Sequence, residues 1–62
     1  MELPLDYPAE AARHRRVAEE FRAMAAYTTD DGLRAAYTQL ASGYDALADN
    51  EDRMANNFRT SN

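Results

Sequence analysis

The sequence predicts an all-α protein: an antiparallel two-helix hairpin that completes a four-helix bundle by association. Two segments carry apolar residues at alternating steps of three and four, which is the period of a helix with one apolar face. One short break, at 28–32, separates them, and so short a connector requires the helices to lie antiparallel. The chain has 62 residues and no cysteine, so neither disulfides nor a thiolate zinc site can stabilise it, and association is the remaining usual device for so small a fold.

We expect residues 1–7 to form an extended N-terminal arm, because Pro4 and Pro8 each favour an extended conformation in the residue before them. The apolar residues of this arm alternate with polar residues or proline. The arm is therefore either a strap over a helical surface or a frayed terminus.

The first helix is predicted over 8–27. Pro8 suits the first turn of a helix, where its missing N–H is not needed, and the carboxylate of Glu10 complements the helix dipole. At about 100° per residue, Val17 and Met24 fall within about 60° of Phe21. Phe21 therefore centres the apolar face of this helix.

The second helix is predicted over 31–55, after a run in which Thr28, Thr29 and Asp30 are all suitable N-cap residues. Its apolar seam consists of Leu33, Tyr37, Leu40, Tyr44 and Leu47. The same spacing continues through Glu51, Met54 and Phe58. Asparagines near and beyond residue 55 are weak helix formers, so 56–62 is expected to be a frayed C-terminus.

Alanines recur with a second period, of seven residues, on both predicted helices. On the first helix these are Ala11, Ala18 and Ala25. On the second they are Ala41, Ala48 and Ala55. Small residues at this spacing let antiparallel helices approach closely, with larger side chains on the neighbouring rows. We therefore predict that the alanine rows face each other within the hairpin.

Two helices cannot enclose a core, so the large apolar side chains of both seams need cover from another chain. The predicted interface consists of Val17, Phe21, Met24, Leu33, Tyr37, Leu40, Tyr44 and Leu47. The expected partner is a second copy in a twofold dimer, or a larger protein on which the hairpin docks. Tyr27 points about 120° away from Phe21 and is a further candidate for a contact with another chain.

The formal net charge of −4 argues against nucleic acid and anionic membranes as main partners. The only basic cluster is formed by Arg13, Arg15 and Arg16 with the neighbouring histidine. The hairpin places this cluster near Asp45 and Asp49, so charge matching between helices is preferred over nucleic-acid binding. No apolar run is long enough to span a membrane and the first residues lack a secretion signal, so we expect a cytoplasmic protein.

His14 is the only imidazole and lies on the apolar side of the first helix, one turn after Glu10. These two residues could supply metal ligands, and a metal–carboxylate enzyme centred on Glu10, His14 and Glu51 is one alternative. A histidine on such a face is more often a half-buried packing residue with a hydrogen-bond partner. With the turn near residue 29, that partner is Glu51 or a tyrosine hydroxyl. We predict that His14 and Glu51 form a polar pair that sets the register of the helices, with no metal or cofactor.

Two pairs of acidic residues, Asp30 with Asp31 and Asp45 with Asp49, have the composition of an acid–base site. They fit helix caps and solvated helix faces better, because no nucleophile or phosphate-binding loop accompanies them. We therefore predict a non-enzymatic interaction or regulatory module that self-associates, with no evident small-molecule substrate. The alternative is an accessory subunit or acidic inhibitor that docks on a larger protein, and a nucleic-acid binder is the less favoured third.

One resemblance covers residues 13–48. The run Arg15-Arg16-Val17-Ala18-Glu19-Glu20-Phe21-Arg22, the turn Thr28 to Asp31 with Arg34, and Leu40-Ala41 followed by Tyr44-Asp45-Ala46-Leu47-Ala48 together carry it. The pattern resembles a class of short uncharacterised proteins of alphaproteobacteria. Those sequences typically have an arginine-rich helix, a threonine–aspartate–proline turn and a second helix with a tyrosine and leucine–alanine signature. Asp31 stands where they often have proline. The resemblance implies a helical hairpin and no established activity.

Overall fold

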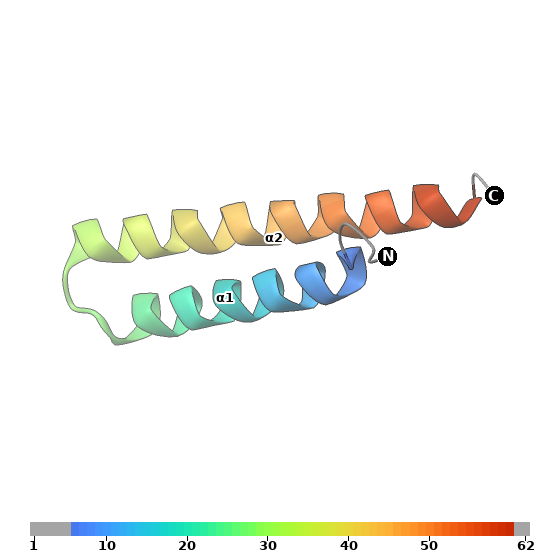
Figure 1. Cartoon of the computed structure of the whole chain (residues 1–62). Coiled ribbons are helices and arrows are strands. Elements are labelled where there is room, and N and C mark those ends of the chain that lie inside the picture. Colours follow the sequence, from blue (N-terminus) through green and yellow to red (C-terminus); the bar gives the residue numbers. More distant parts are fainter. Residues whose placement is uncertain (1–5, 61–62) are drawn as a thin grey trace.

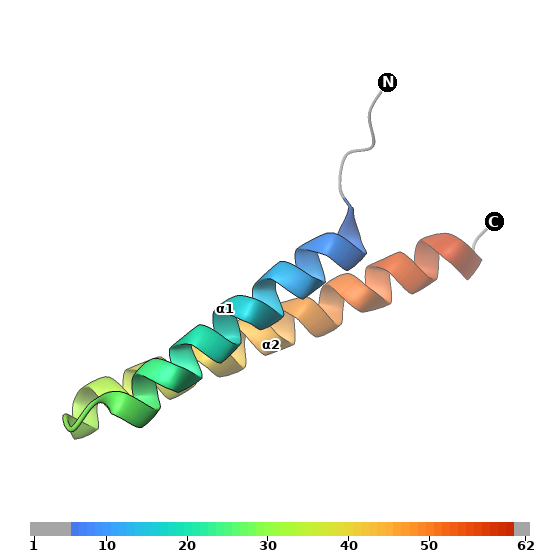
Figure 2. The ribbon, with the colours of Figure 1, turned by 90° about the horizontal axis from the view of Figure 1, so that it is seen from below.

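The computed structural model of the protein is a hairpin of two antiparallel α-helices (Figure 1), and it describes residues 6–60. Helix α1 comprises Tyr7–Tyr27 and helix α2 comprises Asp31–Thr60. The two helices lie side by side along most of α1, and α2 runs on past the N-terminal end of α1 (Figures 1 and 2). The predicted all-α helical hairpin is confirmed.

Helix α1 begins one residue earlier than predicted, because Asp6 rather than Pro8 defines its start. The Oδ1 atom of Asp6 accepts a hydrogen bond from the backbone N–H of Ala9 at 3.2 Å, and its carbonyl accepts one from the N–H of Glu10 at 2.9 Å. The side chain of Asp6 thereby satisfies the amide of Ala9, which has no acceptor within the helix, and its carbonyl accepts the first backbone bond of the helix. Asp6 and Tyr7 consequently belong to the helix and its cap and not to an arm; the predicted strap otherwise falls on residues 1–5, outside the described residues.

The turn is held by capping groups on both sides. Thr28 adopts an extended conformation that ends α1, with its N–H bonded to the carbonyl of Met24 at 3.1 Å. Asp30 caps α2, since its Oδ1 accepts the N–H of Leu33 at 2.8 Å. A Cβ atom at Gly32 would lie 3.2 Å from that same oxygen, so glycine leaves room for the cap.

Arg34 ties the start of α2 back to the end of α1. Its guanidinium donates to the carbonyl of Ala25 at 3.3 Å, to that of Thr28 at 2.8 Å, and to the Asp31 carboxylate at 2.8 Å. The last carbonyls of a helix have no partner within the helix, and a basic side chain can satisfy them. One side chain therefore links both helices and the turn.

Helix α2 extends to Thr60, which is five residues beyond the predicted end. The predicted frayed segment 56–62 is helical through residue 60, and residues 61 and 62 lie outside the described residues. Asparagine costs a helix about 0.7 kcal/mol or less per residue, a local effect that tertiary contacts override. The ring of Phe58 stacks on that of Tyr7, with centroids 5.9 Å apart and planes at 18°, and this contact supports the last turns of α2.

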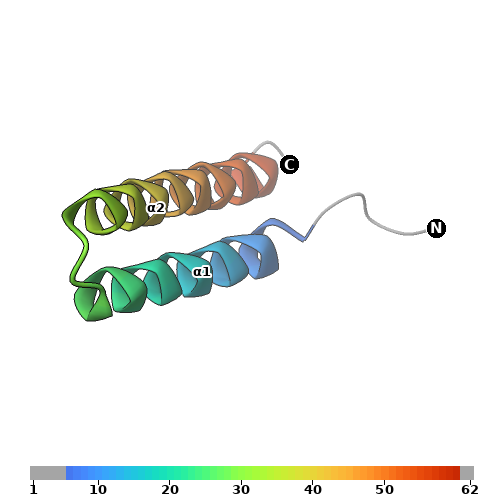
Figure 3. The ribbon, with the colours of Figure 1, turned by 90° about the vertical axis from the view of Figure 1, so that its left-hand side faces the viewer.

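The contact between the helices is made by the alanine rows, as the seven-residue period predicts. Within the described part of the chain, every buried residue is an alanine: Ala11, Ala18, Ala25, Ala41 and Ala48. No large side chain is fully buried among the residues described. Seen from the turn end, residues 6–60 form a single layer of two helices (Figure 3). The two faces of this layer are therefore open to solvent.

Candidate interaction surface and polar cluster

Aromatic rings from both helices stack along one side of the alanine rows. Phe21 lies between Tyr37, with centroids 6.0 Å apart, and Tyr44, with centroids 5.8 Å apart. The imidazole of His14 stacks on Tyr44 at 5.7 Å and 29°. Each pair is in the range and orientation of an offset stack, so these rings hold one another in place across the hairpin. We call Phe21, Tyr37, Tyr44 and His14 the aromatic ladder.

Large aliphatic residues flank the ladder and remain half exposed. On α2 they recur every seven residues, at Leu33, Leu40, Leu47 and Met54, with 41–47% of each residue exposed. On α1, Met24 is 40% exposed and Val17 is partly buried. At about 100° per residue, these aliphatic residues lie farther around each helix from the alanine row than the residues of the ladder do. The aromatic ladder and these aliphatic residues of both helices form one continuous surface, which we call the apolar face.

All eight residues of the predicted interface lie on the apolar face, and the structure adds Met54 and Phe58 to it. Phe58 is 60% exposed and Met54 is 44% exposed. The predicted interface stops at Leu47, although the three-four spacing of the second helix continues through both residues. Tyr27, at the turn end of α1, is 87% exposed and lies off this face, as its helical angle predicts.

Charged residues connect the two helices on the other side of the alanine rows. Arg15 contacts Asp52 at 2.7 Å and Asp49 at 2.9 Å, and Arg22 pairs with Asp45. The hydrogen bonds to Asp52 and Asp49 raise the pKa of Arg15, and the hydrogen bond to Asp45 raises that of Arg22. All five side chains are at least about a third exposed, so these ion pairs orient the helices more than they stabilise them.

The same contacts change the character of the predicted basic cluster. Arg15 is engaged across the hairpin, and Arg13 pairs with Glu10 at 2.5 Å, which raises the pKa of Arg13. Arg16 is exposed. Because acidic side chains accompany two of its three arginines, this surface is mixed in charge and lacks the uniform positive potential typical of a phosphate-binding face.

A polar cluster interrupts the apolar face near the end remote from the turn. Nδ1 of His14 lies 2.8 Å from Oε1 of Glu51, so the contact predicted from the hairpin register is present. A carboxylate can only accept, which places the imidazole proton on Nδ1. The side chains of His14 and Glu51 are 20% and 14% exposed, and a carboxylate oxygen of Glu10 lies within 4.8 Å of the ligand atoms of both. The cluster therefore joins two carboxylates and an imidazole from the two helices.

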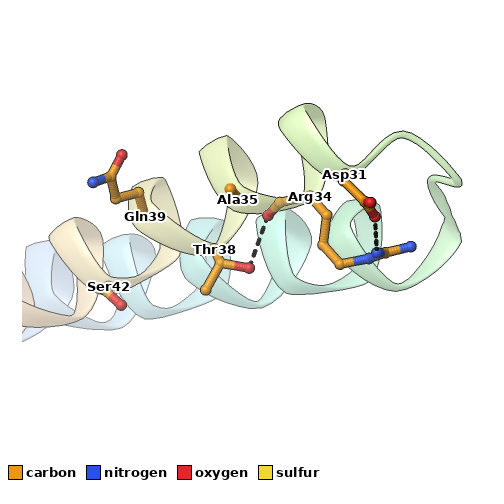
Figure 4. A pocket seen from close by; sticks show the side chains of 6 residues that line it. All are labelled: Asp31, Arg34, Ala35, Thr38, Gln39 and Ser42. Carbon is orange, nitrogen blue, oxygen red and sulfur yellow. Dashed lines mark hydrogen bonds and ion pairs between the residues drawn. The ribbon is translucent and has the colours of Figure 1, made fainter.

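A shallow hollow near the turn offers little to a ligand. Its lining residues are Asp31, Arg34, Ala35, Thr38, Gln39 and Ser42, all on α2 (Figure 4). Since one helix supplies the entire lining, no second wall faces it. Arg34 is bonded to Asp31, and the Thr38 hydroxyl donates to the carbonyl of Arg34 at 2.9 Å. Its charged groups are thus already engaged with each other.

The fold and these surfaces define a class, the all-α helical hairpin with an unburied apolar face. Neither helix within residues 6–60 combines the length and the apolar character needed to cross a bilayer. No protein-family model matches the chain, and no curated protein or solved structure is significantly similar to it.

Proposed function

We propose that this protein is a small non-enzymatic interaction or regulatory module that self-associates through its apolar face to form a twofold, four-helix bundle. One observation carries the proposal. Among the described residues only alanines are buried, whereas six large apolar residues of the apolar face are 40–60% exposed: Met24, Leu33, Leu40, Leu47, Met54 and Phe58. The side chains that usually form a hydrophobic core are therefore exposed to solvent in the single hairpin.

The free energy gained on association comes from covering the exposed part of each apolar side chain. Full burial of a large apolar side chain is worth about 1.5–3 kcal/mol, so covering the exposed half adds about 1 kcal/mol per residue. In a twofold dimer the same residue is covered in both chains, so its contribution counts twice. With these six residues in each chain, the gross gain is on the order of 12 kcal/mol, which lies within the association cost of about 4–15 kcal/mol. The surface is therefore sufficient for a reversible dimer and not for an extremely tight one.

A second copy is the occupant that the surface fits best. Since residues 6–60 bury no large side chain, the hairpin needs cover whenever it is folded, and another copy of the chain is always available. In a twofold pair each chain presents the same face, so apolar rows meet apolar rows. The acidic residues Asp45, Asp49 and Asp52, which contribute to the net charge of −4, lie on the opposite side of the alanine rows. Their charge is thus directed away from the proposed contact.

The test is to place a charge in the middle of the apolar face. Leu40 is 45% exposed, so Leu40→Glu disturbs the hairpin little and puts a carboxylate into the proposed interface, where its desolvation opposes association. The control Gln39→Glu adds the same charge at the neighbouring exposed position outside the face. Sedimentation velocity at matched concentrations is expected to give a smaller species for Leu40→Glu and an unchanged one for Gln39→Glu. Equal behaviour of both variants would contradict self-association through this face.

A further inference from the structure

We propose that Glu10, His14 and Glu51 form a binding site for a divalent transition-metal ion that clamps α1 to α2 at the end of the hairpin remote from the turn. One imidazole nitrogen of His14 and one carboxylate oxygen from each glutamate all lie within 4.8 Å of one another. Glu10 and His14 are four residues apart and share one side of α1, while Glu51 comes from α2, 37 residues after His14. The site therefore bridges two helices within one chain.

The donor set matches the chemistry of a borderline cation. One imidazole nitrogen with two carboxylate oxygens suits Zn²⁺, Fe²⁺ or Mn²⁺, whereas Mg²⁺ and Ca²⁺ prefer oxygen alone. Zinc bonds to these atoms are about 2.0–2.2 Å long, which puts the ligand atoms of a tetrahedral ion roughly 3.3–3.5 Å apart. That separation lies between the 2.8 Å from Nδ1 of His14 to Oε1 of Glu51 and the 4.8 Å within which all three ligand atoms lie. Small rotations of the two glutamates would close the geometry, with one coordination position left for water.

The surroundings hold the ligands in place. The imidazole of His14 stacks on Tyr44, and its Nδ1 points at Glu51. Glu51 is 14% exposed, less than any other carboxylate in the ion pairs of the described residues. It also occupies a position of the α2 seam where the spacing places an apolar residue. A carboxylate held in such a setting loses hydration, and a bound cation compensates for that loss.

Arg13 is the group that competes with a metal ion for Glu10. Its guanidinium contacts Glu10 at 2.5 Å, but the Arg13 side chain is 57% exposed and can turn into solvent. Displacement of this arginine by an ion requires no change in the backbone. Removing the arginine should therefore strengthen metal binding.

A metal ion at this position would stabilise a hairpin that buries little apolar surface. Small chains that bury little apolar surface are commonly held by disulfides or metal ions, and this chain has no cysteine. Arg34 already joins the helices at the turn, whereas the site would join them at the far end. Since one chain supplies all three ligands, the proposal does not depend on self-association.

The experiment titrates chelator-treated protein with Zn²⁺ by calorimetry and follows thermal unfolding by circular dichroism. Glu51→Gln keeps the size of the side chain and a hydrogen-bond acceptor for His14 but removes the anionic ligand. The matched control is Glu20→Gln, an exposed glutamate on α1 about 15 Å along the helix from Glu10. If Glu51→Gln unfolds, Glu10→Gln replaces it, because that change leaves the contact between His14 and Glu51 intact.

Wild type and Glu20→Gln are expected to bind one Zn²⁺ per chain with equal affinity, and Arg13→Gln to bind it more tightly. Glu51→Gln or Glu10→Gln should weaken binding by more than about tenfold. At a free Zn²⁺ concentration one hundred times the Kd, the wild-type melting temperature should rise by about 10–20 °C, and excess Mg²⁺ should not reproduce the rise. The absence of binding, or binding that the glutamate variants leave unchanged, would overturn the proposal. In the presence of Zn²⁺, Leu40→Glu should still bind the ion, which separates this site from the proposed dimer.

Discussion

The substitution Ala18→Leu tests whether the alanine rows determine how closely the two helices pack. Ala18 is fully buried between the helices, so a leucine there must push the helices apart or force the neighbouring side chains out of their rotamers. Overpacking of this kind costs about 1–3 kcal/mol. For a domain of this size, each kcal/mol lowers the melting temperature by about 4–8 °C, which predicts a decrease of about 4 to 24 °C.

The control for this substitution is Ala23→Leu, at an exposed position of the same helix. Alanine and leucine differ little in helix propensity, so the control carries the same intrinsic change without the steric one. Thermal unfolding followed by circular dichroism at one protein concentration compares the two variants with the wild type. If Ala18→Leu is as stable as Ala23→Leu, or more stable than the wild type, close packing through the alanine rows is not what holds the hairpin together.

Two further predictions concern single contacts. Arg34→Ala removes the bonds to the carbonyls of Ala25 and Thr28 and should destabilise the protein by about 1 kcal/mol. The control Arg16→Ala, at an exposed position, should have little effect on thermal unfolding. Equal melting curves of the two variants would mean that Arg34 does not stabilise the turn. Glu51→Leu removes the acceptor for Nδ1 of His14, so the imidazole should shift from the Nδ1–H toward the Nε2–H tautomer, measured by ¹⁵N chemical shifts. Unchanged nitrogen shifts would mean that the two side chains do not interact in solution.

Much of the fold follows from local sequence signals. The helical period, the capping residues around the turn and the seven-residue alanine spacing are sufficient to predict two antiparallel helices and the residues between them. The contact of His14 with Glu51 follows as well, because a turn near residue 29 fixes which residues of the two helices face each other. These features share one property: a rigid, regular helix converts a position in the sequence into a position in space.

The missed features depend on contacts that spacing does not encode. Phe58 stacks on Tyr7, and this contact accompanies the extension of α2 past its weak helix formers. Asp6 precedes the predicted start of α1 and was assigned to the arm because of the neighbouring prolines. Arg34 reaches three groups through a long, flexible side chain. The reach of such side chains depends on where the helices finally lie, which the sequence pattern does not specify.

The central claim is that the apolar face is covered by a second copy of the chain. Sedimentation equilibrium of the wild-type protein over a range of micromolar concentrations tests it most directly, combined with thermal unfolding at the same concentrations. The expected result is a mass that approaches twice the 7.0 kDa of one chain, with a melting temperature that rises with protein concentration. A well-folded species of 7.0 kDa at every concentration, with a constant melting temperature, would contradict the claim.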